Sequence, residues 1–115
     1  MERFMKAVCF TFLAVLSSSA SAKETPLVVP TDAKAKYAIL EVAGAWPSRT
    51  IITRRVGPSG TTYSKSLYNC ANNTVKYIGT GDTLEEMARS KPDPKMAPIV
   101  PEAIADYVGR RACKR

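Results

Sequence analysis

Cys70 and Cys113 are the residues of this chain whose own chemistry is most distinctive. The third of the three cysteines, Cys9, lies in an apolar segment near the start of the sequence. Two thiols in an oxidising compartment form a structural disulfide, and we predict that Cys70 and Cys113 are bonded to each other. The alternative is a redox-active or nucleophilic pair. It would require a lowered thiol pKa, and the sequence has neither a Cys-x-x-Cys motif nor a histidine to lower it.

Other catalytic centres lack the residues that they need. With no histidine among 115 residues, Ser-His-Asp and Cys-His centres and zinc sites that use imidazole are excluded. Glu85 and Glu86 are adjacent and would face different sides of a helix, while Asp93 stands among prolines. The sequence therefore offers no carboxylate pair for acid–base work. We expect a protein that is not an enzyme and that holds no metal and no cofactor.

Positive charge is the second feature with functional consequences, because the chain has 17 Lys+Arg against 10 Asp+Glu. Arg49, Arg54 and Arg55 share one β-like segment. Four more cations close the sequence: Arg110, Arg111, Lys114 and Arg115. Basic clusters bind acidic glycans, anionic lipid headgroups, nucleic acid or acidic proteins, and the alternative is charge that serves only solubility and helix ends. With the aromatic Trp46 nearby, we predict a binding surface made of Trp46, Arg49, Arg54 and Arg55.

Residues 1–22 have the pattern of a secretory signal peptide. Arg3 and Lys6 precede ten apolar residues, 7–16, and Ala20-Ser-Ala22 supplies the small residues of a cleavage site. The alternative is a membrane anchor, but ten residues extend only about 15 Å as a helix, roughly half of a bilayer core. We expect export to a bacterial periplasm or to the cell surface, no membrane span after cleavage, and no nucleic acid as partner.

The remaining chain changes pattern once, from strands to helices. Residues 23–36, with Pro26 and Pro30, predict an extended N-terminal arm, and residues 37–115 predict a single domain. Strands are predicted at 37–43, 48–56, 61–70 and 74–79, joined by turns short enough to require antiparallel pairing. A short helix is predicted at 82–89 and a C-terminal helix at 101–113. This order favours the α+β class: an antiparallel sheet of about four strands, with the C-terminal helix packed on it and fastened by the disulfide.

The start of the short helix has two possible registers. Thr83 with Glu86 fits a capping box, and Asp82 with Glu85 fits one residue earlier. The preceding segment Gly79-Thr-Gly81 predicts a strand-to-helix turn, with an anion site at the helix start as the alternative.

The second half of the chain resembles a known family in four short motifs. They are Leu67-Tyr-Asn-Cys70-Ala, Val75-Lys-Tyr-Ile78, Ile99-Val-Pro-Glu102 and Ala112-Cys113. Over residues 63–113 these are similar to the surface-adhesin protein E family of Gram-negative bacteria. The resemblance implies an antiparallel sheet on a terminal helix, a disulfide between Cys70 and Cys113, and binding of host matrix or serum proteins.

These observations together predict an exported binding protein without catalytic activity. It would be adhesin-like and would use its basic and aromatic surface to bind host or envelope macromolecules, either a protein partner or an acidic glycan. The alternative is a periplasmic accessory or structural factor of an envelope assembly or secretion system. An inhibitor of a host enzyme is a third class.

Overall fold

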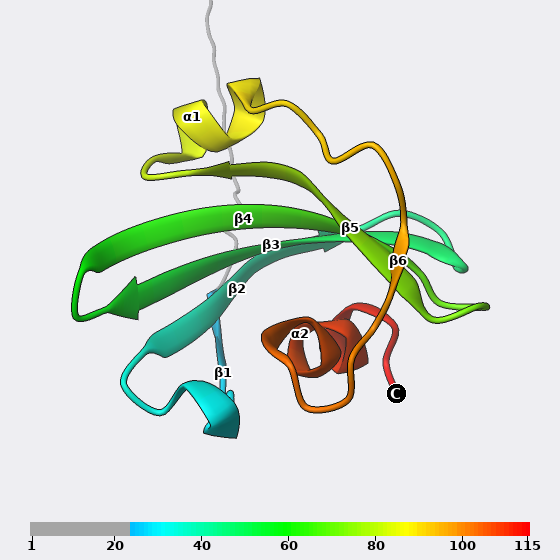
Figure 1. The fold of residues 1–115 in the computed structure, drawn as a ribbon, viewed down its shortest axis with the longest axis horizontal. Helices are drawn as coiled ribbons and strands as arrows, with labels where there is room; N and C mark the ends of the chain where they lie inside the picture. Colours follow the sequence, from blue (N-terminus) through cyan, green and yellow to red (C-terminus); the bar gives the residue numbers. More distant parts are fainter. Residues whose placement is uncertain (1–23) are drawn as a thin grey trace, which may run out of the picture.

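The computed structural model describes residues 24–115 and shows a six-stranded antiparallel sheet with two short helices (Figure 1). The predicted signal peptide, residues 1–22, lies outside the described residues. The sheet order is β1-β2-β3-β4-β5-β6, so each strand pairs with its neighbours in the sequence. The strands are β1 Thr25–Leu27, β2 Lys36–Ala43, β3 Ser48–Gly57, β4 Gly60–Asn69, β5 Thr74–Gly81 and β6 Ala97–Pro98. The helices are α1 Leu84–Arg89 and α2 Ile104–Ala112, with a 3-10 turn at Pro30–Asp32.

The α+β class is confirmed, but the expected number of about four strands was too low. The two additional strands are the outermost ones: β1, in the segment expected to be an arm, and β6, in the proline-rich segment. They have three and two residues, which is too short to show an alternating pattern. Each contains a proline, and proline is tolerated at sheet edges because its missing N–H removes no internal ladder bond.

Helix α2 begins later than residue 101, where the sequence pattern placed it. Glu102 has a φ of 65°, in the left-handed region, so a right-handed helix cannot run through it. The Glu102 N–H instead donates to the Asp106 carboxylate at 2.8 Å. The Thr31 hydroxyl donates to the Glu102 carbonyl at 2.9 Å, which joins the 3-10 turn to the start of α2.

The inner face of the sheet, defined as the face covered by α2, carries the hydrophobic core. Ile39, Ile51 and Tyr68 from the strands pack against Val108 and Ala112 from the helix. Burying a side chain such as Ile51 contributes about 2 kcal/mol of stability. The structure confirms the predicted disulfide, with 2.03 Å between the two sulfurs of Cys70 and Cys113. It joins the segment after β4 to the end of α2.

Tyr68 fixes how closely α2 approaches the sheet. Its hydroxyl donates to the Ala105 carbonyl at 2.7 Å, and burial raises the pKa of the phenol. A Cβ on Gly109 would lie 2.7 Å from the Tyr68 ring, so only glycine permits this contact. The Tyr68 ring and the absence of a side chain at Gly109 therefore set the distance between α2 and the sheet.

Helix α1 lies on the side of the sheet opposite α2 (Figure 1). The Thr83 hydroxyl accepts from the Glu86 N–H at 3.1 Å, which selects the later of the two predicted capping registers. Cβ atoms on Gly79 and Gly81 would lie 2.3 Å and 2.6 Å from backbone atoms of Met87. Because glycine has no Cβ, these two positions allow the backbone of α1 to pack directly against β5.

Candidate functional site

The structure separates the three arginines of the predicted binding surface. Alternation along β3 places Arg49 and Arg55 on the inner face, whereas Arg54 points to the opposite face. Arg49 and Arg55 are six residues apart on a strand that rises about 3.4 Å per residue, so they lie near opposite ends of the inner face. Each of the three arginines consequently has its own surroundings.

Arg54 is neutralised by a carboxylate. Its two terminal nitrogens donate to the two Glu24 carboxylate oxygens, both at 2.6 Å. The hydrogen bond from Arg54 lowers the pKa of the Glu24 carboxyl, and the same bond raises the pKa of the guanidinium. The pair leaves no net charge at this position for a ligand.

Arg55 is also neutralised, in a three-residue network. Its Nε and Nη2 donate to the Asp32 carboxylate at 2.8 Å and 3.2 Å, and the Tyr37 hydroxyl donates to the same carboxylate at 2.5 Å. The hydrogen bond from Arg55, followed by that from Tyr37, lowers the pKa of Asp32. Burial, followed by the bond to Asp32, raises the pKa of Tyr37 to about 12. The network ties the 3-10 turn to β2 and β3.

Arg49 lies at the C-terminal end of α2. Its Nε donates to the Ala112 carbonyl at 3.0 Å, which places a cation at the negative end of the helix. Its Nη1 donates to the Gly44 carbonyl. The side chains of Arg49, Trp46 and Lys114 line one hollow, and Trp46 is 63% exposed. The structure therefore brings Trp46 and Arg49 together with the basic end of the chain.

A larger hollow, here called the basic concavity, lies between Arg49 on β3 and the basic end of the chain. Its volume is about 500 Å³, and it is lined by Thr25, Ile39, Val42, Arg49, Arg110, Arg111, Lys114 and Arg115. Five of the eight lining residues are cationic, and none of the eight is acidic. Arg110 is paired with Asp106 at 2.9 Å and stacks over Tyr107. Lys114 and Arg115 make no ion pair within residues 24–115.

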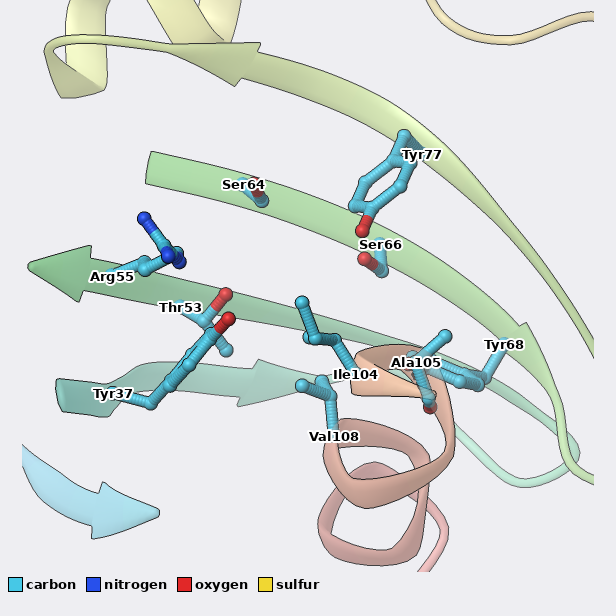
Figure 2. Close-up of a pocket in the computed structure, with 10 residues that line it drawn as sticks. All are labelled: Tyr37, Thr53, Arg55, Ser64, Ser66, Tyr68, Tyr77, Ile104, Ala105 and Val108. Carbon is cyan, nitrogen blue, oxygen red and sulfur yellow. Dashed lines mark hydrogen bonds between the residues drawn. The ribbon is translucent and has the colours of Figure 1, made fainter. Parts of the chain in front are cut away.

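A second hollow, here called the hydroxyl cleft, lies between the inner face and the N-terminal half of α2 (Figure 2). Its cavity volume is about 80 Å³. It is lined by Tyr37, Thr53, Arg55, Ser64, Ser66, Tyr68 and Tyr77 from the strands, with Ile104, Ala105 and Val108 from α2. Sequence reasoning missed this cleft, although the alternation of Ser64 and Ser66 in one strand was visible.

Comparison of the chain with protein-family models, curated proteins and solved structures finds no match. The resemblance to the surface-adhesin E family therefore stays a prediction. Among residues 24–115, no three His, Cys, Asp or Glu side chains gather as a metal site would require. No helix in that same range is long and apolar enough to cross a bilayer.

Proposed function

We propose that this chain is an exported, non-enzymatic binding protein that holds an acidic part of a host or envelope macromolecule in the basic concavity. One observation carries the proposal: five cationic residues line one hollow that has no acidic residue in its wall, and within residues 24–115 only one of the five, Arg110, is paired with a carboxylate. The predicted surface is thereby revised. Arg49 and Trp46 remain in it, Arg54 and Arg55 leave it because carboxylates already neutralise them, and the end of α2 joins it.

The charge of the concavity favours an anionic ligand for two reasons. Cations of one sign in a hollow reinforce one another's potential and raise the local concentration of anions. Lys114 and Arg115 have no partner carboxylate within residues 24–115, so a ligand would not have to break an ion pair to reach them. Their attraction is screened by salt, since the Debye length is about 8 Å at physiological ionic strength.

Trp46 supports a macromolecular partner over a small free anion. Its indole is 63% exposed beside Arg49, and Val42 in the concavity wall is 38% exposed. A large aromatic side chain next to arginine is typical of the residues that contribute most to protein–protein affinity. An acidic protein segment can use both the charge and the apolar rim, whereas a small anion uses only the charge.

Binding of the chain to acidic polymers tests this proposal. We expect poly-L-glutamate or a sulfated polysaccharide to bind the wild-type protein, with an affinity that falls as salt rises. The variant Lys114→Gln/Arg115→Gln is expected to bind about tenfold more weakly, a loss of about 1.4 kcal/mol. Isothermal titration calorimetry measures both affinities.

The matched control removes the same charge elsewhere. Lys34→Gln/Lys91→Gln neutralises two exposed lysines that do not line the concavity. It is expected to bind within about twofold of wild type, because screening limits the reach of distant charges. Equal losses in the two variants would show that net charge, rather than the basic concavity, governs binding, and would overturn the proposal.

The class of the binding partner and the compartment in which it is bound also belong to the proposal. An adhesin-like protein binds host macromolecules at the cell surface, and the alternative, an accessory factor of an envelope assembly or secretion system, binds a periplasmic partner. The Trp46→Ala variant addresses the partner. A protein partner is expected to lose affinity when the indole is removed, while binding of poly-L-glutamate stays the same.

A further inference from the structure

Helix α2 covers only part of the inner face of the sheet. Under the helix the strands present Ile51 and Tyr68, each 1% exposed. Farther along the same face they present small hydroxyl side chains instead, with Thr53 paired with Ser64 across β3 and β4. Ser66 pairs with Tyr77 on β5. The face thus changes from apolar to hydroxylated at the edge of α2.

Two of these hydroxyl residues are buried, and neither hydroxyl has a hydrogen-bond partner within residues 24–115. Thr53 is 7% exposed and Ser66 is 6% exposed. The hydrogen bonds around the cleft join Tyr37 and Arg55 to Asp32, and Tyr68 to Ala105; within residues 24–115 none involves the Thr53 or Ser66 hydroxyl. Buried hydroxyls nearly always have a hydrogen-bond partner. Their partners are therefore expected to be molecules that occupy the cleft, either waters or the hydroxyl groups of a ligand that replaces them.

The cleft has little net charge, which limits the ligand to neutral molecules. Arg55 is its one cationic residue, and Asp32 engages it through two hydrogen bonds. An anion would have to compete with Asp32 for the guanidinium. A neutral ligand with several hydroxyl groups can instead donate to and accept from serine, threonine and tyrosine, since each hydroxyl does both.

The size of the cleft sets how much of a ligand can enter. A cavity of about 80 Å³ has room for two or three waters at roughly 30 Å³ each. Tyr77 is 41% exposed, which places it at the rim, and Figure 2 shows its hydroxyl directed toward Ser66. One edge of a larger molecule can therefore occupy the cavity while the remainder stays in solvent beside Tyr77.

We propose that the hydroxyl cleft binds a neutral polyhydroxylated ligand, which inserts one hydroxylated edge between Thr53, Ser66 and Tyr77 and replaces the waters there. Its hydroxyls satisfy the two buried side chains, and the rings of Tyr37 and Tyr77 lie beside it. This site is separate from the basic concavity, since the two hollows share no lining residue. Whether the hydroxyl cleft binds such a ligand does not depend on whether the basic concavity binds an acidic partner.

Titration of the ¹⁵N-labelled protein with neutral polyols tests the proposal. Glycerol, mannitol and glucose are added separately, and amide shifts are followed by NMR. We expect saturable shifts at Thr53, Ser64, Ser66 and Tyr77. Saturation by glycerol as well as glucose would identify a site for any short polyol, whereas saturation by glucose alone would identify a sugar site. The absence of saturable shifts with all three compounds would overturn the proposal.

Variants that each lack one hydroxyl group of the cleft provide a second test of the proposal. Thr53→Val keeps the shape of the side chain, and Ser66→Ala is nearly as small as serine; each is expected to weaken binding at least tenfold. Thr50→Val is the matched control, because Thr50 lies on the same strand and faces the other side of the sheet. Should a buried variant lose its dispersed spectrum, Tyr77→Phe replaces it, since Tyr77 is 41% exposed and its hydroxyl is one of the three proposed contacts. Unchanged affinity in the folded variants would contradict the proposal.

Discussion

Arg54 and Arg55 are adjacent in the sequence, yet they have different partners. One pairs with Glu24 and the other with Asp32, because successive side chains of a strand point to opposite faces. Both were predicted to contribute to a binding surface, and each is paired with a carboxylate from the N-terminal part of the described chain. Within residues 24–115, Lys114 and Arg115, which follow α2, are among the cations that make no ion pair.

The hydrogen bonds of Asp32 with Arg55 and Tyr37 make the stability of the protein vary with pH in the acidic range. Arg55, and then Tyr37, lower the pKa of Asp32 below its unfolded value of about 3.9. The stabilisation that the ionised Asp32 carboxylate gives the folded state is therefore complete above that value, and it is lost as the pH falls through the folded pKa. We expect Asp32→Asn to melt lower than wild type at neutral pH, with the difference shrinking in acid. Thermal melts from pH 7 to pH 2 measure it, with the exposed Asp93→Asn as control. A constant difference across this range would contradict the prediction.

Gly109 provides a prediction in which two effects of opposite sign compete. Alanine has a higher helix propensity than glycine, worth about 1 kcal/mol. The new Cβ would, however, lie 2.7 Å from the buried Tyr68 ring, and overpacking a core costs about 1–3 kcal/mol. The overpacking cost exceeds the gain over most of its range, so we expect Gly109→Ala to lower the free energy of unfolding, by up to about 2 kcal/mol, in urea titrations. A variant as stable as wild type would show that α2 can shift away from the sheet without cost.

The helices are too short to be stable by themselves. Helix α1 has six residues and α2 has nine, while isolated helices shorter than about 12–15 residues are marginal in water. Each is held by the sheet: α1 by close backbone contact with β5, and α2 by Tyr68, the core and the disulfide. The position of α2 in turn shapes both hollows.

Loss of the disulfide is expected to release α2. The bond closes a loop with a sequence separation of 43, for which the chain-entropy relation gives about 4 kcal/mol of stabilisation. Cys70→Ser and Cys113→Ser should each lower the melting temperature strongly, and the double variant should match the single ones. Addition of reductant should lower the melting temperature of wild type to the same value. Single variants that melt like wild type would show that the crosslink adds no stability.

Across the whole molecule, the two hollows lie at opposite ends of α2. The hydroxyl cleft is lined by Ile104, Ala105 and Val108 from its N-terminal half, and the basic concavity by Arg110 and Arg111 from its C-terminal half. One helix therefore forms a wall of a neutral site and a wall of a cationic site, and the two can be tested independently.

The proposed function of the whole protein leads to a prediction about its cellular location. An adhesin-like protein is expected to be cut when intact cells are treated with an external protease. An envelope factor is expected to be cut only after osmotic shock breaches the outer membrane. Mass spectrometry of the fragments distinguishes the two outcomes. Protection on intact cells would contradict the adhesin-like form of the proposed function and would favour a periplasmic partner.

Local patterns in the sequence predicted much of this fold. Alternating β-formers and short turns predicted the four long strands, the Thr83 capping box predicted α1, and two cysteines predicted the disulfide. These features depend on residues close together in the chain or on a single pair. The strands β1 and β6 were missed because edge strands of two or three residues have no periodicity to detect.

The sequence by itself determined the α+β class, the crosslink and the excess of positive charge. Only the tertiary structure decided which cations are free, because pairing of Arg54 with Glu24 and of Arg55 with Asp32 brings together segments 30 and 23 residues apart. It also decided where the hollows lie, since a hollow forms where α2 ends or leaves the sheet uncovered. Contacts between distant segments depend on strand register and helix placement, which no local pattern of residue types specifies.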